Sequence, residues 1–312
     1  MTIQRIVSFL PSATELIYEL GEEDLLYGVT HECKYPTEAQ RKPQVISSVI
    51  DSEVLSSSEI NNTTCKLLQD GKDIFILNEV NLKNANPDLI ITQETCEVCA
   101  AYTNQTTKAI EILKKKPMIH SMDPHSLEEI LSSVIEIGKI LEKQEKANEI
   151  KTLLSKKIEN ISKSPKSKKP KVLAIEWIEP FFTAGHWIPE MIEIAGGENL
   201  ISKRREHSRK ITMQEITESN PEIIILMPCG FNTQRTVDEY NDILRKNPEW
   251  NELTAVKNES VFAVDANSFF SKPSIRTVTG LEILAKIIHP SNFKNMVIPE
   301  ESCSKISAST GV

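Results

Sequence analysis

The pentapeptide Pro87-Asp88-Leu89-Ile90-Ile91 recurs in the second half of the chain as Pro221-Glu222-Ile223-Ile224-Ile225. In each copy a proline stands directly before a short apolar run. This pattern is typical of a helix that ends before the proline and a chain that then enters a buried strand. The same unit therefore occurs once in each half, and it predicts one parallel sheet per half.

Further short apolar runs alternate with helical patterns around these two copies. The predicted strands are Ile6–Leu10, Leu25–Thr30 and Asp88–Thr92 in the first half, and Val172–Trp177, Glu222–Met227 and Ser260–Val264 in the second. The length of 312 residues agrees with two domains of about 150 residues each. We therefore expect an α/β fold with two lobes, each built on a parallel sheet.

An amphipathic pattern with 3.6-residue spacing runs from about Ser126 to Ile161 and predicts one long helix between the halves. At 1.5 Å per residue this spine helix would be about 50 Å long, enough to join two lobes. The polar stretch Ser162–Pro170 follows it, and the Ser-rich C-terminus is typical of disorder. The expected divisions are an N-terminal lobe over 1–125, the connecting spine helix over 126–162, a C-terminal lobe over 171–291 and a disordered tail over 292–312.

Composition and charge narrow the classes of function. A net charge of −8 gives no global electrostatic support for a nucleic-acid or anionic-membrane partner. The ten glycines form neither of the two common phosphate-binding loops. The longest apolar run, Ile223–Met227, is far shorter than the ~20 residues that span a bilayer. Because Met1–Leu10 has the pattern of a strand rather than of a signal peptide, we expect a cytoplasmic protein with reduced cysteines. We also expect a monomer that does not insert into a membrane.

Unusual polar and aromatic residues follow the predicted strands. In open parallel sheets, ligands bind beyond the carboxyl ends of the strands. Segments at these ends are Thr30–Cys33, Gln93–Cys99, Glu176–Trp187, Pro228–Phe231 and Asp265–Phe270. A ligand cleft between two lobes, lined by these loops, is the simplest interpretation. In the first loop of the fold, Ser12-Ala13-Thr14-Glu15 has the pattern of a capping box that begins a helix.

The cysteines allow another interpretation. Cys96 and Cys99 could bind a metal ion, act in redox chemistry or be two buried apolar residues. Acidic neighbours disfavour thioredoxin-like redox chemistry, because they raise a thiol pKa. A structural zinc site needs four ligands, so His31 and Cys33 would have to complete the set. The rival function is therefore a metal-dependent enzyme that holds zinc or iron at these four residues, with Glu94 as the base.

Two further stretches each have a structural and a functional interpretation. His186 and Trp187 stand between a strand end and a helix start, where packing and ligand contact are equally expected. The run Lys203–Lys210 carries five basic residues in eight. A solvated loop is the commoner explanation in an acidic chain, and the alternative is a loop that attracts a negatively charged part of the ligand.

Several motifs occur in an order that is typical of one family. They are Leu10-Pro11-Ser12-Ala13-Thr14-Glu15-Leu16, Tyr35-Pro36, Pro87–Ile91, Phe182-Thr183-Ala184-Gly185 and Ala195-Gly196-Gly197-Glu198-Asn199. From about Arg5 to Pro290 the chain resembles the cobalamin-type solute-binding proteins of ABC importers, of the periplasmic-binding-protein class III whose lobes are joined by a rigid helix. Gly28–Cys33 and Gly-His-Trp-Ile-Pro-Glu from Gly185 make it similar, more narrowly, to a branch of cobalamin-binding proteins without a signal peptide.

The resemblance implies non-catalytic binding of cobalamin or a related corrinoid or metal chelate in the cleft between the lobes. Cobalamin would be the bound ligand, and its metal would find an imidazole or thiolate partner in His31, His186 or a cleft cysteine. No residue is expected to be catalytic. Together with the loops above, it predicts as ligand contacts Ser12, His31, Glu32, Glu94, Trp177, Phe182, His186, Trp187, Asp265, Asn267, Ser268 and Phe269. A third interpretation is a module that passes its ligand to a partner enzyme.

The resemblance also bears on the membrane partner. Importer-linked members present a glutamate seven residues before each strand-entry proline, where it docks on arginines of the permease. In this chain those positions are Val80 and Gln214, with Glu79 and Glu215 one residue away. A shift of one residue turns a helical side chain by about 100°. We therefore do not expect docking on an ABC permease.

Overall fold

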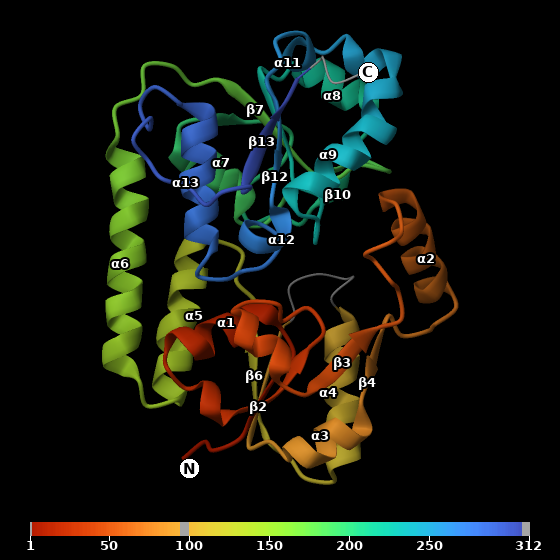
Figure 1. Ribbon diagram of the computed structural model, residues 1–312, viewed down its shortest axis with the longest axis vertical. Helices are drawn as coiled ribbons and strands as arrows, with labels where there is room; N and C mark the ends of the chain where they lie inside the picture. The colour runs from red at the N-terminus through yellow and green to blue at the C-terminus, as the bar shows by residue number, and fades with distance from the viewer. Residues whose placement is uncertain (1, 94–99, 308–312) are drawn as a thin grey trace. The chain divides into compact units, whose positions relative to one another are not determined.

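The computed structural model describes residues 2–93 and 100–307, which form two compact units (Figure 1). The first unit comprises Met1–Leu55, Asn62–Pro124 and Glu128–Leu153. The second comprises Ser56–Asn61, His125–Leu127 and Leu154–Val312. Two short segments in the first half of the sequence thus belong to the second unit.

The first unit contains a six-stranded sheet in the order β4-β3-β2-β1-β5-β6. Its strands are β1 (Ile6–Ser8), β2 (Leu26–Thr30), β3 (Gln44–Ser48), β4 (Phe75–Leu77), β5 (Leu89–Gln93) and β6 (Met118–Met122). All neighbours pair in parallel except β4, which is antiparallel to β3. Because β2 lies on one side of β1 and β5 on the other, the carboxyl end of β1 is a topological switch point.

Helices cover this first sheet and close its core. They are α1 (Pro11–Glu19), α3 (Glu79–Ala85), α4 (Ala100–Leu113) and α5 (Leu127–Ile140), with short 3-10 helices at Glu23–Leu25 and Thr37–Arg41. A further helix, α2 (Ser57–Gln69), has residues in both units. The core side chains come from strands and helices alike: Val7, Phe9, Val45, Ile46, Leu82, Ala85, Ile90 and Ala109.

The second unit contains a seven-stranded sheet in the order β10-β8-β7-β11-β12-β13, with β9 also paired to β7. The strands are β7 (Lys171–Trp177), β8 (Phe182–Thr183), β9 (Glu198–Asn199), β10 (Arg209–Lys210), β11 (Ile223–Leu226), β12 (Val261–Val264) and β13 (Cys303–Ile306). The central strands β7, β11 and β12 are parallel, so their carboxyl ends meet at one edge. The strands β8 and β13 run antiparallel to β7 and β12.

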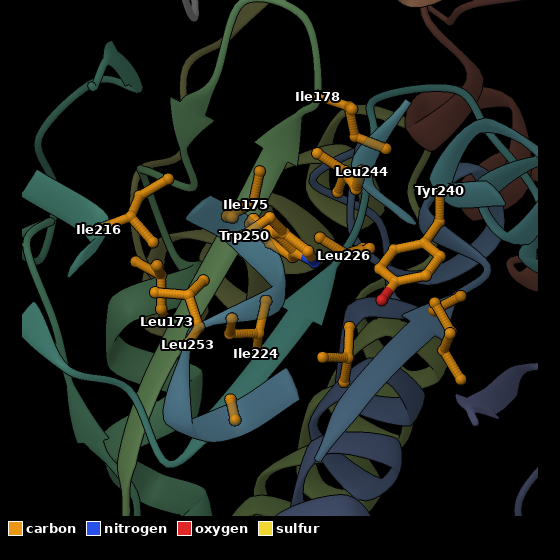
Figure 2. Packing of buried hydrophobic residues seen from close by; sticks show 14 of the residues in the cluster. Leu173, Ile175, Ile178, Ile216, Ile224, Leu226, Tyr240, Leu244, Trp250 and Leu253 are labelled. Carbon is orange, nitrogen blue, oxygen red and sulfur yellow. The ribbon is translucent and has the colours of Figure 1, made fainter. Parts of the chain in front are cut away.

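The helices of the second unit are α7 (Ile188–Ala195), α8 (Met213–Ser219), α9 (Thr233–Asp242), α10 (Pro248–Asn251), α11 (Thr254–Lys257), α12 (Ala266–Phe269) and α13 (Thr277–Ile288), with a 3-10 helix at Leu244–Lys246. Side chains of α8 to α11, among them Trp250, belong to one hydrophobic core. Figure 2 shows Trp250 among aliphatic side chains of β7 and β11, including Ile175, Ile224 and Leu226. The Trp250 ring also stacks on Phe181, with centroids 5.8 Å apart. None of the helices in the described ranges is long and apolar enough to cross a bilayer.

The predicted α/β class and all six predicted strands are confirmed, within a few residues at each end. Strands β3, β4 and β6 were not predicted. Each of them has side chains that are only partly buried or exposed, as at Ile76 and Met118. Polar residues interrupt the apolar pattern of β3 and β6, and β4 is only three residues long, so none of the three has a clear strand signal.

The prediction of one continuous spine helix over 126–162 is wrong. The segment forms α5 (Leu127–Ile140) and then α6 (Gln144–Lys163), separated by a turn in which Glu142 adopts a left-handed φ of +59°. Both helices bury one face, so the apolar spacing continues across the turn and hides it. Gly138 in α5 lets the two helices approach closely, because a Cβ there would collide with the Cβ of Ala147 in α6.

The prediction of a disordered tail is wrong for residues 292–307, and residues 308–312 lie outside the described ranges. Residues Cys303–Ile306 form β13, which pairs with β12 from Val264 to Val261. Ile306 is 6% exposed and joins the core around Trp250. The Ser-rich composition of this segment concealed a short strand whose stability comes from its partner.

Replacing Gly138 by alanine tests the contact between α5 and α6. Alanine normally stabilises a helix interior relative to glycine by up to about 1 kcal/mol. Here we expect the opposite sign, with a loss of about 1–3 kcal/mol in the free energy of unfolding, because the added methyl group overpacks the contact with Ala147. Urea denaturation measures the difference. The exposed neighbour Lys139→Ala is the control and should change stability by less than about 0.5 kcal/mol. Equal urea midpoints of unfolding for Gly138→Ala and Lys139→Ala would contradict the close contact between α5 and α6.

Candidate functional site

Ser12 lies in the first turn of α1, at the carboxyl end of β1. The helix begins at Pro11, with Leu10 as an N-cap that supplies no side-chain cap. The expected capping box is therefore wrong, because the proline starts the helix one residue before Ser12. The Ser12 side chain is buried, with 2% exposed, and its Oγ has no hydrogen-bond partner. A buried hydroxyl of this kind beside the N–H groups of a helix start is suited to a polar group of a ligand.

The residues that follow β2 are held mainly by local hydrogen bonds. The His31 N–H donates to the Ile46 carbonyl (3.0 Å), and the half-buried ring lies 6.2 Å from that of Phe75. The Nδ1 atom of His31 is buried without a hydrogen-bond partner. Half-buried Glu32 donates its N–H to Thr30 Oγ1 (3.1 Å). Of the predicted contacts in the first unit, Ser12 and His31 thus combine burial with an unused polar atom.

Cys33 is a buried thiol with ordinary polar neighbours. Its Sγ lies 3.1 Å from Thr14 Oγ1 and 3.4 Å from Thr30 Oγ1, and the residue is 2% exposed. This arrangement matches the packing interpretation of a small buried residue. Glu94, Cys96 and Cys99 lie outside the described ranges. Within residues 2–93 and 100–307, no three His, Cys, Asp or Glu side chains form a group that could hold a metal ion.

Aromatic side chains follow β7 and lie in β8. Trp177 is half-buried, packs edge-on to Phe231 at 5.6 Å and donates from Nε1 to the Ser57 carbonyl (3.2 Å). The Ser57 N–H in turn donates to Glu239 Oε1 (2.8 Å), which attaches the first turn of α2 within the second unit. Phe182 is also half-buried. Both predicted contacts therefore keep part of an aromatic surface exposed.

Three histidines of the second unit come together beside the start of α7. His186 precedes this helix in a left-handed conformation with φ +54°. Its Nδ1 lies 3.0 Å from Nδ1 of His125, which follows β6. The His207 ring is edge-on to both, with centroids 5.1 Å from His186 and 5.4 Å from His125. Only His186 was predicted as a site residue. His125 follows a strand that the sequence did not reveal, and His207 stood inside a run that was interpreted by its charge.

Glu176 is a half-buried residue that sequence reasoning did not select. It is the sixth residue of β7, and its Oε2 accepts from the Gly185 N–H (3.4 Å), directly before His186. Burial raises the pKa of Glu176 to about 7, although the neighbouring Ser208 and Gly185 groups favour the ionised form. A glutamate at the end of the apolar run Val172–Ile175 was the available signal. Such perturbed carboxyls are enriched at functional sites.

The remaining predicted contacts of the second unit have partners within it. Trp187 is 4% exposed and donates from Nε1 to the Phe270 carbonyl (3.2 Å). Phe269 is 7% exposed beneath the guanidinium of Arg276. The Asp265 carboxylate accepts from the Ser268 N–H and begins α12, while Asn267 Oδ1 accepts from Lys272. These contacts explain the residues structurally, and their contact with a ligand stays a prediction.

Three of the five basic residues in Lys203–Lys210 pair with carboxylates, and a fourth contacts a hydroxyl. The interactions are Lys203 with Glu206, Arg204 with Glu193, Arg209 with Glu215, and Arg205 with the Ser126 hydroxyl. The solvated-loop interpretation accounts for these contacts. Glu79 and Glu215, which neighbour the expected docking positions, are engaged as well. Glu79 pairs with Lys83, and Glu215 closes the capping box at the start of α8.

Comparison with known proteins places this geometry in a family context. Residues 6–268 match the family described as Periplasmic binding protein. An uncharacterized ABC transporter substrate-binding lipoprotein of Bacillus subtilis, YvrC, is 25% identical over 300 residues, which cover 93% of this chain and 82% of that protein. The high-affinity heme uptake system protein IsdE of Staphylococcus aureus is 28% identical over 154 residues, or 47% of this chain and 52% of that protein.

Solved structures show the same fold. The periplasmic vitamin B12 binding protein BtuF of Vibrio cholerae superposes with a TM-score of 0.64 at 18% identity, covering 92% of this chain and 96% of that one. The expected fold class, of the class III periplasmic-binding-protein type, is thus confirmed.

Replacing Glu176 by glutamine tests the raised pKa of its carboxyl. The folded-state pKa of about 7 lies above the ordinary value of 4.5, so the group favours folding at low pH, and this contribution is lost as the pH rises through 7. Relative to wild type, Glu176→Gln should therefore gain about 2–3 kcal/mol more stability at pH 8 than at pH 5. Urea denaturation at both pH values measures this. The exposed Glu179→Gln is the control, and an equal effect of Glu176→Gln at the two pH values would contradict the assignment.

Proposed function

Because the chain belongs to the periplasmic binding protein family, we propose that it binds a metal-chelating tetrapyrrole, either a corrinoid such as cobalamin or a haem. Its relatives are substrate-binding proteins of ABC transporters, so the chain is a solute-binding protein. The prediction that it is not an enzyme is confirmed, and the rival interpretation as a metal-dependent enzyme is set aside.

The ligand class rests chiefly on the match to IsdE, a heme uptake protein, at 28% identity over 154 residues. The fold of BtuF, a vitamin B12 binding protein, gives separate support. Both ligands are large macrocycles around a metal ion, with polar groups at the rim. A site for such a molecule needs apolar surface for the ring and hydrogen-bonding groups for the rim.

Each unit, taken by itself, carries groups suited to such a ligand at the carboxyl ends of its own parallel strands. In the second unit, Trp177 and Phe182 keep aromatic surface exposed, and aromatic faces bury a large ring at low entropic cost. In the first unit, the Ser12 hydroxyl is buried without a partner at the start of α1. We assign Ser12 and the N–H groups of the first turn to a rim carboxylate or amide of the ligand.

An absorbance titration of the purified protein with hydroxocobalamin, and in parallel with haemin, tests the proposal. We expect saturable binding of one of them with a shifted spectrum, and the preferred ligand identifies the subclass. Ser12→Ala should weaken that binding by about fivefold to tenfold, the value of one hydrogen bond. Ser133→Ala is the matched control, because Ser133 is also buried but its hydroxyl donates to the backbone carbonyl of Glu129 within α5. No saturable binding of either ligand at high micromolar concentration would contradict the proposal.

Location and partners are proposals of the same kind. The sequence predicts a cytoplasmic monomer that does not dock on an ABC permease, whereas relatives are described as a lipoprotein and as periplasmic proteins. The two expected docking positions hold Val80, which is 67% exposed, and Gln214, whose side chain donates to Glu218. Because one residue is a valine and the other a glutamine, neither position offers a carboxylate. Fractionation of the source cells would decide between the two locations.

A further inference from the structure

The segment Ser162–Lys171, which we call the connector, leads from the last turn of α6 to the first residue of β7 (Figure 1). All of it belongs to the second unit. Its ten residues include five lysines and no aspartate or glutamate, in a chain whose net charge is −8. The connector is therefore a strongly positive stretch of an acidic protein, and neither the fold nor the proposed solute accounts for it.

Polar contacts hold the connector in place. The Lys166 ammonium donates to the carbonyls of Ile161 (2.6 Å) and Ser162 (3.2 Å) and thereby caps the carboxyl end of α6. From the segment that follows α13, the Asn292 side chain donates to the Pro165 carbonyl. These contacts attach the middle of the connector to its surroundings, so the side chains beside them extend from a fixed backbone.

A cavity of about 440 Å³ lies between the connector and the carboxyl end of α7. Small-molecule sites in proteins have volumes of about 300–1,000 Å³, so the cavity can take a small polar molecule. Gly196 at the end of α7 packs directly against the Lys166 side chain, because a Cβ on Gly196 would collide with it. The polar and charged residues that line the cavity are Ser162, Lys166, Ser167, Lys168, Lys169 and Glu193.

The charges around the cavity favour an anion. Glu193, the acidic residue of the lining, is paired with Arg204. The Lys166 ammonium is engaged with the end of α6. Lys168 and Lys169 are exposed, and among the residues that the structure describes neither has an ion-pair or hydrogen-bond partner. The carboxyl end of a helix carries a partial charge of about −0.5, so these two lysines outweigh the end of α7.

Two ammonium groups and two hydroxyls at one cavity match the chemistry of a phosphate group. An ammonium is a compact charge with three donors, and the hydroxyls of Ser162 and Ser167 can each donate one hydrogen bond. A phosphate monoester has about two negative charges and three acceptor oxygens at neutral pH, so it can use all four groups. A carboxylate has one charge. A nucleic acid needs a basic surface along many phosphates, which the net charge of −8 opposes.

We propose that the cavity beside the connector binds a phosphate group, carried either by a small phosphorylated molecule or by a lipid headgroup. Lys168 and Lys169 supply the charge, Ser162 and Ser167 supply hydrogen bonds, and Lys166 fixes the connector. The site lies entirely within the second unit and shares no residue with the tetrapyrrole site proposed above. Each of the two proposals can therefore fail without the other.

Calorimetric titration of the purified protein with inorganic pyrophosphate tests the site. We expect one saturable site per chain with a Kd of about 0.1–1 mM at low ionic strength, weakened by added salt because the lysines are exposed. Replacing Lys168 and Lys169 together by glutamine should weaken binding by about tenfold. The control variant replaces Lys246 and Lys294, two exposed lysines outside the cavity, by glutamine and should change the affinity by less than about twofold.

Two measurements on the wild-type protein locate the site and identify the source of the phosphate. In amide NMR spectra, pyrophosphate should shift the signals of residues 162–169 and 193–196 and leave the Ile224 N–H, which lies inside the sheet, unchanged. Co-sedimentation compares phosphatidylcholine vesicles with and without phosphatidic acid. Binding that needs phosphatidic acid and is reversed by pyrophosphate assigns the site to a lipid headgroup. Pyrophosphate binding without vesicle binding assigns it to a soluble phosphate ester.

Three results would overturn the proposal. The first is the absence of saturable pyrophosphate binding at millimolar concentration. The second is an equal loss of affinity in the two double variants, which would show that the total charge of the protein matters and the cavity does not. The third is vesicle binding that pyrophosphate does not reverse, which would assign the lysines to a membrane surface without a phosphate site.

Discussion

Parallel pairing of the central strands is the constraint on which the rest of this structure depends. In the second unit, β11 pairs with β7 from Ile223 and Val172 to Leu226 and Ile175, and both strands are buried. Because parallel strands end at the same edge, this register delivers Glu176 and Trp177 to the edge where α12 begins after β12. The same constraint in the first unit places Ser12 at the end of β1, where the strand order reverses.

The sequence predicted those parts of the fold whose signal is local. The strands β1, β2, β5, β7, β11 and β12 consist mostly of apolar residues and are mostly buried, so their local pattern identifies them. The break between α5 and α6 escaped prediction, because it depends on a left-handed residue at Glu142 and on the approach of Gly138 to Ala147. Strand β13 escaped as well, since a four-residue strand in a Ser-rich segment is recognisable only beside β12.

The candidate site shows the same difference between features with a local sequence signal and contacts that only the folded chain creates. The order of strands and motifs along the chain was enough to place Ser12, Trp177, Phe182 and His186 near strand ends. It could not reveal that His125 and His207 approach His186, because these residues are about 20 to 80 positions apart along the chain. Burial of predicted contacts such as Trp187 was equally hidden, since a tryptophan after a strand has the same sequence whether it faces a ligand or the core.

Glu176 shows how a strand end can respond to pH without the core taking part. Protonation of its carboxyl removes a charge that burial disfavours, and it therefore favours the folded state. The carboxyl lies near the end of β7, where its Oε2 accepts from the Gly185 N–H directly before His186. Because Glu176 is not among the side chains of the core around Trp250, we expect its titration to act on this edge of the sheet while that core stays folded.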